Sequence, residues 1–293
     1  MAISDKQSDT KVVFIHIPKT GGSTLNGLLQ KQYGRNAIYS TDSKAVEKSL
    51  EAFKQLDPSQ RDEIQFLVGH TPFSASATLP GNYLYVTLLR EPVERVISLY
   101  YHILRRTDHP LHEIISSNNW SLQACIQNTA SIEFDNLQTR HLSGQPSESI
   151  AFGQCNASTL QAAVNNLKTH FAVVGTVERF DESLLLLRRK FGWKYMLYRR
   201  RNVGNNKPSS HQFDQDTIDL VRSYNKYDLE LYEVAKDLLQ KRIDEQGPTF
   251  KLEIEVFKLL NTSANYFYAK VFQPAQKLLL KDRLIAHKTE RDG

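Results

Sequence analysis

The fold is decided by residues 12–34, which read VVFIHIPKTGGSTLNGLLQKQYG. The first six residues form an apolar, largely β-branched run that suits a strand buried on both faces. A loop with a proline, a lysine and two adjacent glycines follows it. After the loop, Leu25, Leu28, Leu29 and Tyr33 recur at the spacing of one helix face. The pattern predicts a strand, a tight turn and a helix.

The predicted turn suits the binding of an anion. Gly21 and Gly22 can take a positive φ and carry no Cβ, so the N–H groups of residues 20–24 can point into one concavity. The unpaired amides and the helix dipole favour negative charge there. We therefore expect the anion to be held by this loop and its side chains, namely Lys19, Thr20, Gly21, Gly22, Ser23 and Thr24.

The motif differs from the Walker P-loop in the position of its lysine. In the Walker order G-x-x-x-x-G-K-[ST] the lysine follows the second glycine, whereas Lys19 precedes the glycine pair. An ordinary ATPase is therefore disfavoured. The turn alone leaves open a plain connection between strand and helix with an exposed lysine.

Length and composition describe an ordinary globular protein. The chain has 293 residues, enough for one substantial core with an appendage, and 40% of them are hydrophobic. The formal net charge of +5 suits an anionic cofactor or an acidic polymer, although many proteins that bind neither are as basic. We expect no nucleic-acid partner.

Nothing in the chain predicts secretion or a membrane span. Cys125 and Cys155 have neither a metal-type nor a redox-type spacing. The first ten residues lack the apolar stretch of a signal peptide, and no apolar run approaches the roughly 18 residues that span a bilayer. We therefore expect a soluble, cytoplasmic protein.

The middle of the chain alternates between apolar runs and helical patterns. Three further segments are predicted to be buried strands: residues 64–68, 83–89 and 171–175. Residues 35–63 show weak helical periodicity and predict a surface helix. Residues 214–241 predict two amphipathic helices that break near Asn225, with Asp228 as an N-cap.

A histidine follows one of these strands. His70 lies just beyond residues 64–68, at the strand end where open α/β sheets bind ligands. An imidazole can accept a proton near neutral pH. Since a loop histidine is often only structural, the neighbouring anion turn is what favours catalysis here.

A second anion site is predicted after residues 83–89. Arg90 ends that strand, and the helix that begins at Pro92 carries Arg95 and Ser98 on a neighbouring row. For Arg95, a structural ion pair with a nearby carboxylate is an equally good interpretation.

Three blocks in this order and spacing resemble one enzyme family. They are HIPKTGGSTL (16–25), VGHTPF (68–73) and LLREPVERVISLYYH (88–102). Together they resemble the sulfotransferase family that includes the heparan sulfate 2-O- and 6-O-sulfotransferases and bacterial relatives. Weaker resemblance at residues 134–144, 173–192 and 224–235 extends it over residues 11–240.

The resemblance implies a fold and a set of roles. The fold would be α/β, with three layers around a central parallel sheet as in P-loop NTPases, and would bind 3′-phosphoadenosine 5′-phosphosulfate. The turn of residues 19–24 would hold the 5′-phosphosulfate, and Arg90 with Ser98 would hold the 3′-phosphate. His70 would be the catalytic base, and Lys19 would stabilise the departing oxygen. No carboxylate pair indicates a magnesium site, so we expect no metal.

Three details qualify the resemblance. Glu91 stands where relatives often have aspartate, and both are acidic. The paired glycines place the chain on the carbohydrate side of the sulfotransferases by analogy. Lys207 and the arginines at 199–201 belong to a loop that the family uses to cover the nucleotide, although a solvated basic loop is the simpler interpretation. Residues 134–144 are predicted to lie either near the cleft, as in relatives, or on a surface helix.

The last part of the chain has no counterpart in the family. After residue 247, apolar positions recur at helical spacing to residue 285, with Pro274 as a break. We predict a sulfotransferase domain at 11–246 and a helical C-terminal appendage at 247–293. The appendage is expected to pack on the core or on a second subunit, which would give a homo-oligomer.

The sequence therefore predicts an enzyme that transfers a sulfuryl group from the nucleotide to a hydroxyl, on a glycan, by in-line displacement. Two alternatives stay open. A phosphotransferase or kinase with the same anion loop would need a magnesium ligand at a strand end, and the placement of Lys19 disfavours it. A catalytically inactive member would bind nucleotide or glycan only. The sequence does not encode the identity of the acceptor.

Overall fold

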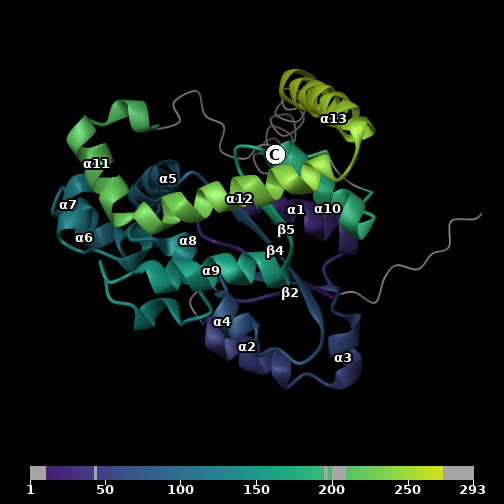
Figure 1. Ribbon diagram of the computed structural model, residues 1–293, viewed down its shortest axis with the longest axis horizontal. Helices are drawn as coiled ribbons and strands as arrows, with labels where there is room; N and C mark the ends of the chain where they lie inside the picture. The colour runs from purple at the N-terminus through teal and green to yellow at the C-terminus, as the bar shows by residue number, and fades with distance from the viewer. Residues whose placement is uncertain (1–10, 43–44, 195–196, 200–208, 273–293) are drawn as a thin grey trace, which may run out of the picture.

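A parallel sheet of five strands forms the centre of the computed structural model, which describes residues 11–42, 45–194, 197–199 and 209–272 (Figure 1). The strand order is β2-β3-β1-β4-β5. Along the chain the strands are β1 (Lys11–Ile15), β2 (Ile38–Ser40), β3 (Phe66–Gly69), β4 (Tyr83–Leu89) and β5 (Phe171–Thr176). Parallel neighbours need crossover connections, and helices supply them. The predicted α/β fold with a central parallel sheet is confirmed.

Helices cover both faces of this sheet. Val12 and Phe14 of β1 point to a cluster with α1 (Gly22–Tyr33), α10 (Phe180–Phe191) and α13 (Pro248–Phe267). Val13 and Ile15 point to the opposite cluster, because side chains alternate along a strand. That second cluster includes α2 (Val46–Lys54), α4 (Phe73–Ser76), α8 (Leu137–Leu142), α9 (Ala157–His170) and the first half of α12 (Lys226–Asp244). Figure 1 shows α12 and α9 side by side.

A third apolar cluster lies beside the sheet, at the left of Figure 1. It joins α5 (Pro92–Arg105), α6 (His112–Ser117), α7 (Leu122–Gln127) and α11 (Gln215–Tyr224). The remaining short elements are α3 (Pro58–Glu63), η1 (Ile132–Phe134), η2 (Ser147–Ser149), η3 (Ser210–Gln212) and the π-helical η4 (Tyr268–Phe272).

Strand register brings three loops to one edge of the sheet. Ile15 of β1 pairs with Gly69 of β3 and with Thr87 of β4. The residues that follow these strands therefore emerge together at the carboxyl edge, where α/β sheets bind ligands. His70 and Arg90 are among them.

The structure differs from the predicted elements in two places. Residues 35–63 do not form one helix but β2, α2 and α3. β2 has three residues and pairs only with β3 at the sheet edge, so it is too short to carry a strand pattern. Asp228 is not an N-cap, because α12 already begins at Lys226 after the confirmed break at Asn225.

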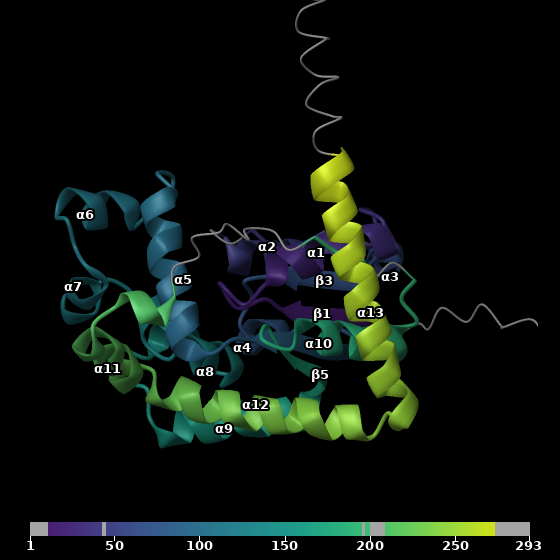
Figure 2. The same cartoon turned by 90° about the horizontal axis from the view of Figure 1, so that it is seen from above.

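α13 stands at a steep angle to the end of α12 (Figure 2). Phe250, Ile254 and Phe257 are buried in the cluster that includes α10. Packing on the core, one of the two predicted arrangements, is therefore present. The domain boundary at residue 246 stays a prediction, and Pro274 lies outside the described residues.

Candidate active site

The turn between β1 and α1 is curled by two residues with positive φ. Lys19 has a φ of 71° and Gly21 a φ of 80°. Sparsely populated backbone conformations cost about 1–3 kcal/mol for a residue other than glycine, and they cluster at functional sites. α1 begins at Gly22 without a side-chain N-cap bond. Its first amides are therefore left to another acceptor.

Hydrogen bonds inside the turn narrow the predicted set of anion donors. The N–H and the hydroxyl of Thr20 both donate to the carbonyl oxygen of Ile17, at 3.3 and 2.8 Å. The N–H of Thr24 donates to the carbonyl oxygen of Gly21 at 3.0 Å. The N–H groups of residues 21–23 have no acceptor in the part of the chain that the structure describes. These three amides form the kind of concavity that binds anions at a helix N-terminus.

The two glycines of the turn meet different requirements. A Cβ at Gly22 would stand 2.0 Å from both Cδ2 and Nε2 of His16, so any side chain there would collide with the imidazole. A Cβ at Gly21 would have only ordinary contacts, the nearest at 3.6 Å to Val177. Gly21 is favoured instead by its positive φ.

Three imidazoles gather behind this turn. The rings of His16 and His70 lie edge to face, with centroids 4.5 Å apart. Burial and the charge of Lys19 lower the pKa of His70 below its usual 6.5. Burial, with a contribution from His70, lowers the pKa of His16 and of His141 to about 3. All three are neutral at pH 7, and His70 is the half-exposed one that can accept a proton from a bound molecule.

Lys19 lies among other cations. Burial, followed by the charges of Arg105 and Arg90, lowers its pKa to about 8. The carboxylate of Glu133 acts in the opposite direction without cancelling them. A bound anion would favour the charged lysine and relieve this repulsion.

Arg90 reaches from the end of β4 to the turn. Its Nη1 donates to the carbonyl oxygen of Lys19 at 3.3 Å, and its Nη2 lies 3.7 Å from the carboxylate of Glu94. The side-chain amide of Gln138 holds its backbone. The Arg90 N–H donates to Gln138 Oε1, and Gln138 Nε2 donates to the Arg90 carbonyl oxygen, both at 2.9 Å. The structure thus brings together the predicted residues Lys19 and Arg90.

α8, which carries Gln138, is itself held by α12. Oδ2 of Asp228 accepts the N–H of Gln138 at 3.1 Å. Oδ1 accepts the N–H and the hydroxyl of Thr139, at 2.7 and 2.8 Å. Burial raises the pKa of Asp228, and Arg95 and the Thr139 donors oppose the rise. Asp228, predicted to cap its own helix, therefore caps the start of α8.

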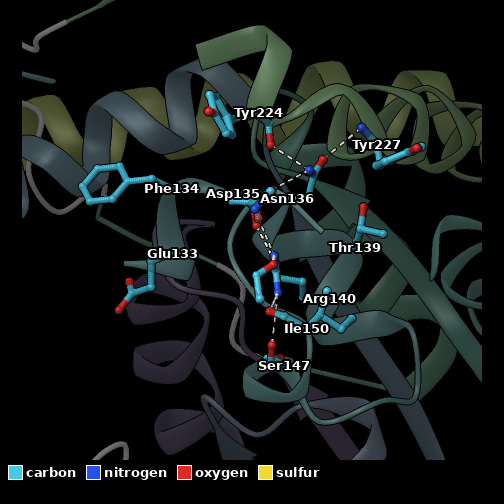
Figure 3. A network of polar contacts seen from close by, with 12 residues as sticks. Glu133, Phe134, Asp135, Asn136, Thr139, Arg140, Ser147, Ile150, Tyr224 and Tyr227 are labelled. Carbon is cyan, nitrogen blue, oxygen red and sulfur yellow. Dashed lines mark hydrogen bonds and ion pairs between the residues drawn. The ribbon is translucent and has the colours of Figure 1, made fainter. Parts of the chain in front are cut away.

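Figure 3 shows the continuation of this buried network. Nδ2 of Asn136, which has a φ of 45°, donates to the carbonyl oxygen of Tyr224 at 2.7 Å. Arg140 pairs with Asp135 and donates to the carbonyl oxygen of Ser147 at 3.2 Å. All six residues of α8 are buried, so the surface-helix interpretation of this segment is wrong.

Arg95 is buried, and the structural ion pair that was one interpretation of it is absent among the described residues. Its Nη2 donates to the carbonyl oxygen of Glu133 at 2.6 Å. Its Nε and Nη1 have no hydrogen-bond partner within the described ranges. Burial lowers the pKa of Arg95, and the charges of Asp228 and Glu133 oppose the shift.

Ser98, the predicted partner of Arg90, is half-buried on α5. It lies one turn beyond Glu94, on the side of the helix that carries the Arg90–Glu94 pair. Glu94 also accepts the N–H of Ser210 at 3.0 Å, which fixes the end of the loop predicted to cover the nucleotide.

The basic residues of that loop divide into two groups. Lys207 lies outside the described residues, as do the two arginines at 200–201. The guanidinium of Arg199 lies 3.8 Å from the ring centroid of Tyr268. Arg199 therefore contacts the C-terminal helical segment.

Sequence reasoning missed two residues of the site. His16 directly follows β1, as His70 follows β3, so the same strand-end rule would have selected it. Gln138 carries no such signal, since its contact with Arg90 joins residues 48 apart in the chain.

The described ranges contain no cluster of three or more His, Cys, Asp or Glu side chains arranged to hold a metal ion. None of the helices described there combines the length and apolar character needed to cross a bilayer.

Comparison with known proteins places the chain in a family. A model of the sulfotransferase family matches residues 4–234. Heparan-sulfate 6-O-sulfotransferase 1 of Homo sapiens is 26% identical over an alignment that covers 81% of this chain and 67% of the relative. Heparan-sulfate 6-O-sulfotransferase 2 of Gallus gallus is 24% identical over an alignment that covers 80% of this chain and 68% of the relative. Heparan-sulfate 6-O-sulfotransferase 3 of Homo sapiens is 25% identical over 283 residues, covering 79% and 58%. Because the family model matches well over half of it, the chain belongs to the sulfotransferase family.

Proposed function

We propose that the chain transfers a sulfuryl group from 3′-phosphoadenosine 5′-phosphosulfate to a hydroxyl of a carbohydrate. One observation carries the proposal. Three unpaired amides, a lysine crowded by cations and the neutral imidazole of His70 meet at one edge of the sheet. The family membership supports the transfer, and the names of the relatives support the carbohydrate.

The turn suits the 5′-phosphosulfate of the donor. The N–H groups of residues 21–23 would donate to its oxygens, together with the hydroxyls of Ser23 and Thr24. Thr20 would support the turn and not the anion, because both of its donors are used on Ile17. The charge of the donor would offset the repulsion that lowers the pKa of Lys19.

Arg90 and Ser98 would hold the 3′-phosphate. Ser98 lies on the side of α5 that carries Glu94, the residue with which Arg90 pairs, and a guanidinium can bind two phosphate oxygens at once. Because Arg90 also donates to the carbonyl oxygen of Lys19, binding of the 3′-phosphate would stiffen the turn that holds the other end of the donor.

Lys19 and His70 would divide the chemistry between them. The donor supplies a sulfuryl group on a phosphate oxygen. As the bond from sulfur to that oxygen breaks, a bond to the acceptor oxygen forms, which gives a sulfate ester and adenosine 3′,5′-bisphosphate. The Lys19 ammonium would stabilise the charge on the departing phosphate oxygen. His70 would take the proton of the acceptor hydroxyl, for which its lowered pKa leaves it unprotonated at pH 7.

The acceptor is assigned from the relatives and from charge. Arg105 is exposed at the end of α5, yet its charge lowers the pKa of Lys19. Positive charge at the open side of the site suits an acidic sugar chain.

A thermal-shift comparison tests the donor. Adenosine 3′,5′-bisphosphate should raise the melting temperature, whereas ATP with magnesium should raise it much less. Stabilisation by ATP with magnesium alone would overturn the proposal in favour of a phosphotransferase. Labelled donor offered with acidic glycans, neutral glycans and phenols then tests the acceptor.

A further inference from the structure

The outer face of α13 is apolar, and nothing in the described part of the chain covers it. Leu252, Leu259 and Tyr266 are 67%, 69% and 66% exposed. On the opposite side, Phe250 and Phe257 are buried in the core. A helix that is apolar on two opposite faces packs against two partners, of which the core is one.

The spacing on this outer face is that of a helix packed along a second helix. Leu252, Val256, Leu259, Ser263 and Tyr266 follow one another at alternating steps of four and three residues. This 3.5-residue repeat forms a straight seam along a helix pair. An apolar groove of about 840 Å³ runs beside this seam along α13 and α10.

We propose that this face binds the same face of a second copy, with the two α13 helices antiparallel about a two-fold axis near Leu259. Leu252 and Tyr266 are equally far from Leu259 in the sequence, so each would pack on the other residue across the axis. A two-fold contact requires a patch that complements itself, which this symmetric spacing provides. The antiparallel order also opposes the two helix dipoles.

The exposed area has the size that a dimer needs. With Leu260 and Phe267, which are also exposed, the apolar side chains of this face offer on the order of 800 Å², the area per partner of a standard-size interface. One of the charges beside the seam is paired within the chain. Glu253 pairs with Arg189 at 3.0 Å.

Sedimentation velocity of the full chain tests the proposal. The wild type should sediment at twice the monomer mass, and the double variant Leu252→Glu/Leu259→Glu at the monomer mass. Lys251→Glu places the same charge on α13 outside the seam and should stay dimeric. A monomeric wild type, including one whose residues 273–293 shield this face, would overturn the proposal. So would a double variant that stays dimeric while it still melts cooperatively.

Single cysteines test the orientation without weakening the contact. Cys125 and Cys155 are buried, so an introduced thiol is the one that oxidation reaches. Leu259→Cys should form a disulfide dimer, while Leu252→Cys and Lys251→Cys should not. The pair of variants Leu252→Cys and Tyr266→Cys, mixed, should cross-link to each other. Equal self-cross-linking at 252, 259 and 266 would indicate parallel helices and contradict the proposal.

Discussion

The turn after β1 and the buried layer around α8 are both rich in polar groups, and they differ in how those groups are paired. Asp228 accepts three hydrogen bonds, and both ends of the Gln138 amide are used. In the turn, the amides of residues 21–23 have no acceptor among the described residues, and Lys19 is crowded by cations. A buried polar group left without a partner costs about 1–3 kcal/mol. The Asp228 and Gln138 groups of the layer are thus paired within the protein, whereas we propose that an anion completes the turn.

We call the turn the open region, because its polar groups lack partners, and the layer around α8 the closed region. The largest effect is expected in the open region. His70→Ala should lower the transfer rate by about 10²–10⁴-fold, because the acceptor proton loses its base. Affinity for adenosine 3′,5′-bisphosphate, measured by calorimetry, should stay within about twofold of the wild type, since the proposal assigns His70 to the acceptor proton and not to a phosphate. His170→Ala is the control, because His170 ends α9 just before β5 begins, at the far edge of the sheet. Full turnover by the His70 variant would remove the base from the mechanism.

Lys19→Met separates activity from stability. The rate should fall by about 10²–10³-fold with the loss of the charge at the departing oxygen. The free energy of unfolding should not fall, because a lowered pKa means that the fold disfavours the charged lysine. Lys31→Met, exposed on α1, is the matched control. If the Lys19 variant melted at a lower temperature than the control, Lys19 would stabilise the fold and would not belong to the open site.

A substitution in the closed layer should instead lower the free energy of unfolding. Asp228→Asn replaces a carboxylate oxygen by an N–H₂ group that faces other donors, so urea unfolding should show a loss of about 1–3 kcal/mol. Asp237→Asn makes the same change on the exposed side of α12 and should stay within about 0.5 kcal/mol of the wild type. Equal stabilities for the two variants would mean that the layer does not hold the fold.

Gln138→Glu tests whether the layer positions the site. The carboxylate cannot donate to the carbonyl oxygen of Arg90. The backbone that carries the Arg90 guanidinium is then no longer held in place. We expect adenosine 3′,5′-bisphosphate to bind about tenfold more weakly, which corresponds to the free energy of one lost hydrogen bond. Adenosine 5′-phosphosulfate, which has no 3′-phosphate, should bind as before. A loss shared by both nucleotides would indicate general damage to the fold.

The sequence predicts the open region better than the closed one, for a physical reason. The turn is local: the strand, the glycine pair and the helix follow one another within residues 12–34, and each leaves its own pattern. The layer depends on contacts across about 90 residues, such as the one from Asp228 to Thr139. The sequence therefore leaves the segment of α8 open between the cleft and a surface helix, and it predicts Asp228 as a local cap. His16 was predicted as part of a strand, although its ring is what requires a glycine at position 22.

The pH dependence of kcat/KM should show the smallest effect, and it is the most specific test of the open site. In the proposed mechanism His70 acts unprotonated, and its lowered pKa puts the acid limb below pH 6.5. In the same proposal Lys19 acts protonated, and its pKa of about 8 in the free protein puts the basic limb near pH 8. Each limb should fall about tenfold per pH unit. Lys19→Met should flatten the basic limb, because no group would lose its charge there. A basic limb that persists in this variant would mean that Lys19 does not titrate with activity, and the crowded cations would then be a feature of the fold and not of the site.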